Sequence, residues 1–153
     1  MPTISVITTF YNSAQTIAET IHSVLQQDFD DFEFILVDDG SSDESTDVVM
    51  SFKDKRIRLL KPGKIGRANA LNYALNNSLG YYIAIIDADD ECLDSRLRIQ
   101  SQMLINNPDI GLVFSNANLI NLESKKTGQT NFPTEHKEII KCLTSLNPFP
   151  HSS

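Results

Sequence analysis

The sequence contains the run Phe32-Glu33-Phe34-Ile35-Leu36-Val37-Asp38-Asp39-Gly40, which changes from apolar to acidic after Val37. Its aromatic and β-branched residues predict a strand over residues 32–37, and residues 38–43 are typical of a turn. A short strand with so few polar residues is typical of a parallel sheet whose two faces are both covered. The two aspartates are therefore expected at the carboxyl end of a strand, where sheets of this kind bind ligands.

Short strands and helices alternate on both sides of this run. A β-branched strand over residues 4–8 precedes it, followed by a helix that Asn12 and Ser13 are expected to cap. After the run, the pattern predicts helices over residues 47–52, 65–77 and 95–106 and strands over residues 57–60, 81–86 and 110–116. This alternation predicts an α/β fold with a mostly parallel sheet and helices on both faces.

The segment from residue 94 onward gives finer expectations. Asp94 or Ser95 is expected to cap the helix that Pro108 stops, and Leu97, Met103 and Leu104 to form its apolar face. Residues 119–122 are expected to extend a strand, 125–128 to turn, 135–146 to form a helix and 147–153 a loop. No repeat or linker interrupts the chain, so a single domain over residues 1–153 is expected.

Composition and charge exclude several classes of protein. The 153 residues carry 13 Lys and Arg against 20 Asp and Glu, a formal net charge of −7. This acidic balance argues against a nucleic-acid surface, because phosphate binding there depends on clustered cations. The longest apolar run, residues 81–86, is far shorter than the roughly 20 residues that cross a bilayer. No secretory signal is visible, so a cytoplasmic protein is expected.

The cysteines are Cys92 and Cys142, which are far apart in the sequence. Their spacing is not that of a metal site, and both are expected to be inert buried thiols.

Carboxylates follow two of the predicted strands, at Asp38-Asp39 and at Asp87-Ala88-Asp89-Asp90. In a parallel sheet both clusters project from the same edge. Two carboxylates about 4 Å apart repel by roughly 4 kcal/mol at an effective dielectric constant near 20, so a bridging divalent cation is expected. Oxygen ligands favour Mg²⁺ or Mn²⁺ over zinc. The alternative for each aspartate is a turn or capping role, which is expected for Asp43, Asp90 and Asp94.

Four blocks of sequence carry a family resemblance. They are residues 4–12, residues 26–43 apart from Asp30 and Asp31, residues 65–72, and residues 80–90 with Asp87-Ala88-Asp89. In this order they resemble the family 2 glycosyltransferases of the GT-A fold, and the last block resembles the Asp-x-Asp metal motif of that family. The resemblance covers about residues 3–100. It implies an inverting, metal-dependent transfer from a nucleotide-diphospho-sugar, in the synthesis of cell-surface polysaccharide or glycoconjugate.

The resemblance also implies a nucleobase pocket. Asp39 would accept a hydrogen bond from a ring N–H of the base, from an exposed position at the sheet edge. Tyr11 would stack on the base, with an amphipathic cap over the sheet edge as its alternative, and Thr9 would hydrogen-bond the base. Uracil, guanine and thymine all present such an N–H, so a UDP-, GDP- or dTDP-sugar is expected.

The diphosphate and metal roles fall on a second group of residues by the same resemblance. Asp87, followed by Ala88, would face the ribose or reach the metal through water, and Asp89 would bind the Mn²⁺ or Mg²⁺ that acts as Lewis acid to the leaving diphosphate. Lys64 or Arg67 would add positive charge beside the phosphates. Exposed surface positions are the alternative for both basic residues.

An inverting reaction also requires a general base, which the family supplies downstream of the metal motif. No such acidic motif follows here. Glu135 and Glu138 are expected to be solvated, and His151 is expected to be an uninvolved loop residue, with an acceptor-site role as its alternative. We therefore expect a donor-binding core over about residues 1–116 and the start of an acceptor-side region over residues 117–153. This GT-A domain would be incomplete at its C-terminus and inactive by itself.

The acceptor is expected to be a sugar or a lipid-linked glycan, which would place the protein at the inner face of the membrane. Two other functions stay open: a non-catalytic nucleotide-sugar-binding module and a phospho-acceptor receiver domain. A receiver needs an acidic pair after its first strand, where this chain has Thr8-Thr9. A dinucleotide-binding domain is disfavoured because no Gly-x-Gly-x-x-Gly follows that strand.

Overall fold

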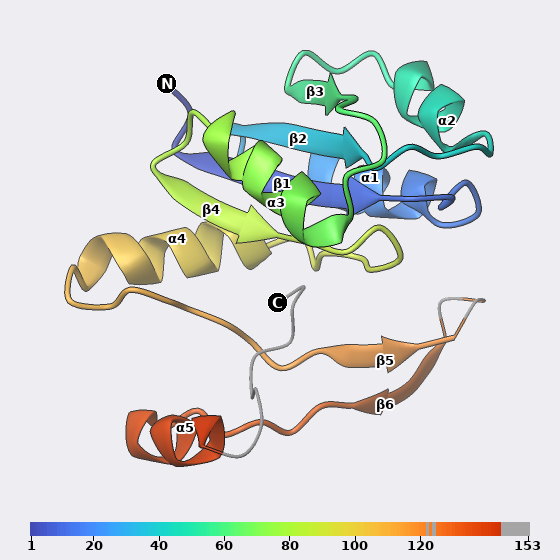
Figure 1. Cartoon of the computed structure of the whole chain (residues 1–153). Helices are drawn as coiled ribbons and strands as arrows, with labels where there is room; N and C mark the ends of the chain where they lie inside the picture. The colour runs from blue at the N-terminus through green and yellow to red at the C-terminus, as the bar shows by residue number, and fades with distance from the viewer. Residues whose placement is uncertain (122, 124, 145–153) are drawn as a thin grey trace.

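The computed structural model describes residues 1–121, 123 and 125–144. Its centre is a parallel sheet in the strand order β3-β2-β1-β4 (Figure 1). The strands are β1 (Ile4–Phe10), β2 (Phe32–Asp38), β3 (Ile57–Leu60) and β4 (Tyr82–Ile85). β1 pairs with β2 as far as Phe10 and Asp38, but with β4 only as far as Ile7 and Ile85. The predicted mostly parallel α/β sheet is confirmed.

Helices cover both faces of the sheet, as predicted, because alternate strand residues point to opposite faces. The helices are α1 (Ile17–Leu25), α2 (Ser45–Ser51), α3 (Arg67–Asn76) and α4 (Arg96–Asn106). α1, α2 and α4 contribute Ile21, Val49 and Leu97 to the larger core cluster, which includes the β2 residues Phe34 and Leu36. α3 covers the opposite face, where its residues Ala70 and Ala74 pack with Ile7, Ile35 and Val37.

The order of the strands creates a crevice at one place. β2 and β3 follow one another to one side of β1, and the chain then crosses to the other side of β1 to form β4. Open α/β sheets bind ligands where the winding direction changes in this way, outside the carboxyl ends of the strands. The carboxyl ends of β1 and β4 are therefore the place to look for a site.

Two helices begin later than predicted because polar groups are used elsewhere. α1 begins at Ile17 with Thr16 in the N-cap position, and the Asn12 and Ser13 side chains do not cap it. α3 begins at Arg67 rather than at residue 65, since Gly66 has a φ of 85° and the N–H groups of Ile65 and Gly66 donate to Asp39. Ser95 is the N-cap residue of α4, although its side chain makes no capping hydrogen bond.

The predicted apolar face of α4 is wrong at Met103. Leu97 and Ser101, one helical turn apart, are the buried residues, whereas Met103 is 48% exposed and Leu104 is half-buried. Met103 lies two residues beyond Ser101, which is about 200° around a helix of 3.6 residues per turn.

The predicted strand over residues 110–116 is not formed. Instead, β5 (Asn118–Ile120) pairs antiparallel with β6 (Lys126–Gln129), and α5 (His136–Leu143) follows. The predicted turn over residues 125–128 is also wrong, because Asn121 Oδ1 accepts the N–H groups of Glu123 and Lys125 and so turns the chain earlier. The expected end of the last helix, from residue 145, and the expected loop over residues 147–153 lie outside the described residues.

The two cysteines differ in burial. Cys92 is buried, which raises the pKa of its thiol despite the nearby Arg96 guanidinium. Cys142 is only half-buried, so the expectation of two buried thiols is wrong for Cys142, which lies on the largely exposed helix α5. Among the helices in the described part of the chain, none has the length and apolar character needed to span a membrane.

Candidate functional site

A cleft of about 1190 Å³ opens at the carboxyl ends of β1 and β4. The last two residues of β1, Thr9 and Phe10, line it together with the following chain as far as Thr16, and residues 42–44 after β2 line it next. Arg67, the first residue of α3, and Asp87, Ala88 and Asp89 after β4 complete the lining. The cleft thus brings together six of the predicted site residues: Thr9, Tyr11, Arg67, Asp87, Ala88 and Asp89.

Asp39 does not occupy the exposed edge expected of it. Its residue is only 9% exposed, and its Oδ1 accepts the N–H groups of Ile65 at 2.7 Å and Gly66 at 2.8 Å. These two bonds orient the carboxylate and fix the chain just before α3. Asp39 therefore has a structural role beside any role toward a ligand, and neither Asp39 nor Lys64 is among the residues that line the cleft.

Lys64 lies against Tyr11 rather than beside the acidic pair. Its Nζ is 4.6 Å from the centroid of the Tyr11 ring and 3.3 Å from the Tyr11 hydroxyl. Gly40, with a φ of 80°, allows this approach, because a Cβ at that position would lie 2.9 Å from the Cβ of Lys64. The Lys64 ammonium and the Tyr11 ring form a cation–π pair at one end of the site.

Arg67 and Asp87 form an ion pair across the cleft between the start of α3 and the end of β4. Asp89 is exposed, and the carbonyl of Ala88 accepts a hydrogen bond of 2.9 Å from the Thr16 hydroxyl. This bond ties the loop after β1 to the acidic segment after β4. Asp87 is thus paired with a cation of the protein, whereas Asp89 faces solvent.

Asp38 is a structural carboxylate. It is buried, and its oxygens accept hydrogen bonds of 2.7 Å from the Ser41 N–H and the Thr46 hydroxyl. Burial raises the pKa of Asp38, but these hydrogen bonds outweigh burial and hold the pKa below its usual value. The repulsion expected among the acidic residues is therefore relieved in part by the protein itself, through Arg67, backbone N–H groups and hydroxyls.

The donor set of the cleft fits a magnesium or manganese ion. Asp87 and Asp89 lie two residues apart on one loop and offer only oxygen ligands, which these ions prefer. Within the described residues, no group of three or more His, Cys, Asp and Glu is placed to hold a metal. The protein would therefore supply one or two carboxylates, and phosphate and water oxygens the remaining ligands, which is the usual arrangement for Mg²⁺.

Hydrogen bonds of Asn12 and Asp43 hold the first two loops together, a role that the sequence predicted only for Asp43, as a turn residue. Asn12 has a φ of 52°, its N–H donates to the Ser41 hydroxyl at 3.0 Å, and its Oδ1 accepts the Ser42 N–H at 2.8 Å. Asp43 accepts the N–H groups of Ala14 and Ser45, both at 3.0 Å, in the turn role expected of it. Asparagine is enriched in the left-handed region, so Asn12 after a strand was an available signal.

Of the expected acceptor-side candidates, the two within the described residues do not line the cleft. Glu135 and Glu138 are exposed, as expected, with Glu135 in the N-cap position of α5. His151 lies outside the described residues, so its acceptor-site role stays a prediction.

Comparison with protein-family models matches residues 5–152 to the model of glycosyl transferase family 2. The chain belongs to this family. The resemblance carried by the four sequence blocks is therefore confirmed, and the cleft lies in the part of the chain that contains them.

Relatives of known name agree with this membership. The chain is 37% identical over 122 residues to the Escherichia coli UDP-Glc:alpha-D-GlcNAc-diphosphoundecaprenol beta-1,3-glucosyltransferase WfgD, a match that covers 79% of this chain and 48% of WfgD. It is 36% identical over 107 residues to Bacillus subtilis (strain 168) TuaG, provisionally named a teichuronic acid biosynthesis glycosyltransferase, with coverage of 68% and 42%. The chain thus spans less than half the length of these glycosyltransferase-family relatives.

Solved structures confirm the GT-A fold class. S. aureus TarS (residues 1–349) superposes with a TM-score of 0.66 at 27% identity, over 71% of this chain and 33% of that one. Its complex with UDP-GlcNAc gives a TM-score of 0.63 at 27% identity, over 71% and 32%. The mannosyltransferase PcManGT from Pyrobaculum calidifontis, in complex with GDP-Man and Mn²⁺, gives 0.55 at 31% identity, over 59% and 28%.

Proposed function

We propose that this glycosyl transferase family 2 chain binds a nucleotide-diphospho-sugar, as the donor-binding part of an inverting, metal-dependent glycosyltransferase. The observation that carries the proposal is the cleft at the switch in strand winding, where Tyr11, Arg67 and the Asp87-Ala88-Asp89 segment converge. The structural relatives in complex with UDP-GlcNAc and with GDP-Man and Mn²⁺ support it.

The base would bind at the end of the cleft near Tyr11. Tyr11 is 46% exposed, which leaves apolar surface for stacking. Thr9 lies two residues after Ile7, the last residue at which β1 pairs with both β2 and β4. Asp39 Oδ1 is already used by two N–H groups, so Oδ2 would accept the ring N–H of uracil, guanine or thymine. Binding of the base would displace the Lys64 ammonium from one face of Tyr11 or use the other face.

The diphosphate would bind between Arg67 and Asp89. Arg67 carries a planar guanidinium that can bind phosphate oxygens in two places at once, and its side chain is 56% exposed. Asp89, with Asp87, would hold a Mn²⁺ or Mg²⁺ ion, which supplies Lewis-acid stabilisation of the departing diphosphate when it is bound. The Lys64 ammonium, which lies against Tyr11, would add positive charge near the donor phosphates.

We further propose that residues 1–116 form the donor-binding core and residues 117–153 begin the acceptor-side region. In the described residues, all those that line the cleft come before residue 90, and the relatives are more than twice as long as the matched segment. The general base would lie elsewhere in the whole protein, whose acceptor would be a sugar or a lipid-linked glycan. Relatives in polysaccharide biosynthesis support a role in cell-surface polysaccharide.

Calorimetric titration with UDP, GDP and dTDP, with and without Mn²⁺, tests the proposal. We expect one diphosphate to bind and Mn²⁺ to strengthen its binding in the parent but not in Asp89→Asn, which keeps the shape of the side chain without its charge. Asp94→Asn, an exposed aspartate outside the cleft lining, is the matched control and should behave like the parent. Absence of binding by all three diphosphates would refute the proposal, whereas binding without any transfer by the full-length protein would favour the non-catalytic module.

A further inference from the structure

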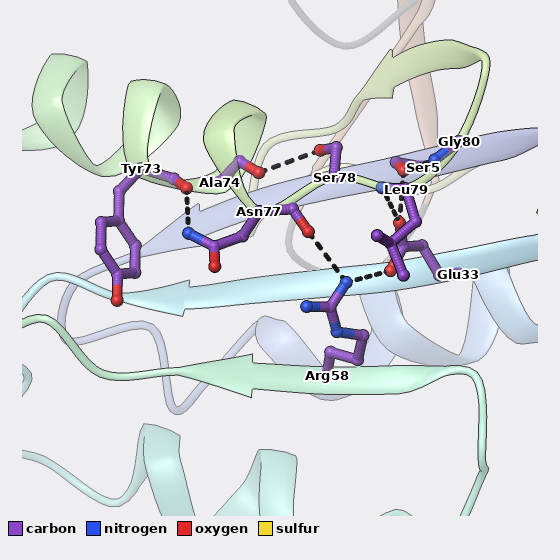
Figure 2. A network of polar contacts seen from close by, with 9 residues as sticks. All are labelled: Ser5, Glu33, Arg58, Tyr73, Ala74, Asn77, Ser78, Leu79 and Gly80. Carbon is purple, nitrogen blue, oxygen red and sulfur yellow. Dashed lines mark hydrogen bonds and ion pairs between the residues drawn. The ribbon is translucent and has the colours of Figure 1, made fainter. Parts of the chain in front are cut away.

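Glu33 is a buried carboxylate that the proposed donor site does not use. It lies near the amino end of β2 and is 6% exposed, on the sheet face that α3 covers (Figure 2). Its Oε1 accepts hydrogen bonds of 2.6 Å from the Ser5 hydroxyl and from the N–H of Leu79, and its Oε2 pairs with Arg58. Burial raises the pKa of Glu33, but these hydrogen bonds outweigh burial and hold the pKa below its usual value, so the group is charged at neutral pH.

Arg58 connects this carboxylate to the end of α3. Its Nη1 donates both to Glu33 and to the carbonyl of Asn77, the C-cap residue of α3, at 2.9 Å. The last carbonyls of a helix have no partner within the helix, and a cation there also interacts favourably with the helix dipole. Figure 2 shows Arg58 between β3 and this helix end, so the ion pair joins two strands to α3.

The turn that follows is held just as tightly. The N–H of Gly80 donates to the Ser5 hydroxyl at 2.8 Å, and a Cβ at Gly80 would lie 2.3 Å from the backbone nitrogen of Ser5. Three backbone groups therefore fix residues 77–80 to the sheet: the carbonyl of Asn77 and the N–H groups of Leu79 and Gly80.

These residues form the connection between α3 and β4. The opposite end of α3 carries Arg67, and the opposite end of β4 leads to Asp87, so the ion pair in the cleft closes the same helix–turn–strand unit at its other end. α3 has ten residues and is about 15 Å long at 1.5 Å per residue. A helix of this length transmits a tilt at one end directly to the other, since its hydrogen-bonded backbone is stiff.

We propose that Glu33 is a positioning residue for the donor site: with Arg58 and Ser5 it fixes the turn over residues 77–80 and thereby sets the place of Arg67 beside Asp87. This inference rests on the proposed binding of a nucleoside diphosphate in the cleft. Glu33 acts through Arg67 and does not touch the ligand.

Asp54 provides a matched control for a role in stability alone. Asp54 is also a carboxylate paired with an arginine near β3, at 2.8 Å from Arg56, and hydrogen bonds from Arg56 hold the pKa of Asp54 below its usual value. Within the described structure, the hydrogen bonds of Asp54 join it to Arg56 and Ile57. Loss of this ion pair therefore breaks a carboxylate–arginine contact like that of Glu33 without releasing the turn over residues 77–80.

The experiment is a double-mutant cycle on the affinity for UDP, GDP or dTDP, whichever the parent binds, in the presence of Mn²⁺. Glu33→Gln should weaken binding by about five- to tenfold, a size that packed networks between distant sites carry. In an Arg67→Ala background the same change should alter affinity by less than about twofold, because the residue through which Glu33 acts is gone. Asp54→Asn should leave affinity within about twofold of the parent.

Thermal unfolding first establishes that each variant is folded at the temperature of titration, and Ser5→Ala, which removes the hydroxyl between Glu33 and Gly80, replaces Glu33→Gln if the latter does not fold. Unchanged affinity in Glu33→Gln, an equal loss in Asp54→Asn, or an equal loss in the Arg67→Ala background would each overturn the positioning role while the proposed function stands. A parent that binds no nucleoside diphosphate would overturn the proposed function, and the positioning role with it.

Discussion

Residues 1–106 and residues 117–144 of this family 2 chain differ in how much they bury. All seven residues of β2 are buried, whereas β5, β6 and α5 contain no buried residue, and Leu119 and Ile140 are each 51% exposed. In Figure 1, β5, β6 and α5 lie below β4 and α4, outside the four-stranded sheet. The hydrophobic core therefore lies in residues 1–106, and all the described residues that line the cleft belong to this region.

The largest contrast between the two regions should come from side-chain truncation. Ile21 is fully buried in α1, so Ile21→Ala should lower the free energy of unfolding by about 2–5 kcal/mol. Ile140→Ala, at a half-exposed position in α5, should change it by no more than about 0.5 kcal/mol. Urea unfolding of the two variants measures the difference, and equal losses would show that the second region is as well packed as the first.

The glycines offer a second contrast. Gly80→Ala would place a Cβ against backbone atoms of β1 that have no room to move, and should cost about 1–3 kcal/mol or more. At Gly128, in β6, the nearest atom to an added Cβ is Leu119 Cδ1 at 3.3 Å, the end of a flexible side chain. Gly128→Ala should therefore be tolerated, and thermal unfolding that shows the reverse order would contradict the difference in packing.

Low pH should destabilise the protein through carboxylates of the first region, residues 1–106. Glu33 and Asp38 have pKa values lowered from 4.5 and 3.8, so below about pH 4.5 the unfolded chain takes up protons that the folded chain does not. Their contribution to stability is thus present above this range and is lost as the pH falls through the folded-state pKa values.

Unfolding free energies measured between about pH 6 and about pH 3 should decline, and the decline should be shallower in Glu33→Gln, which has no carboxyl group to titrate at this position. The same slope in both proteins would show that Glu33 does not contribute to the pH dependence of stability.

The smallest effect is expected from removal of residues 117–153. Because the described residues of that region do not line the cleft, the affinity for a nucleoside diphosphate should change by less than about twofold, or about 0.4 kcal/mol. Calorimetry on residues 1–116 measures this. A large loss of affinity would show that the second region contributes to donor binding and would move the boundary that we propose.

The elements of the first region were predictable because each carries its own signal. The apolar run over residues 32–37 and the aspartates after it define a buried strand and its end, and the acidic segment over residues 87–90 does the same for β4. The parallel sheet then brings the two acidic ends to one edge without further information. The family resemblance added a role for each site residue. The cleft brings six of these residues together, but their roles stay predictions.

Contacts that depend on neighbours were not predictable. The strand expected over residues 110–116 has the right composition, but a strand needs a partner, and within the described residues the sheet ends at β4. Glu33 and Arg58 stand on adjacent strands, and their pairing follows from the register of β2 with β3, which no periodicity of the sequence reveals. The burial of Asp39 follows likewise from the turn before α3 closing over it.

The unequal pairing of β1 has a consequence for how this chain can change its length. β1 is bonded to β2 as far as Phe10, while its bonding to β4 ends at Ile7, so the sheet divides at the edge where the cleft opens. Side chains alternate between the two faces along a strand, so one residue inserted within β1 before Thr9 would exchange the faces to which Thr9 and the buried Phe10 point. A single extra residue within β1 would therefore have to be taken up as a β-bulge, whereas a pair of residues would keep the alternation of faces.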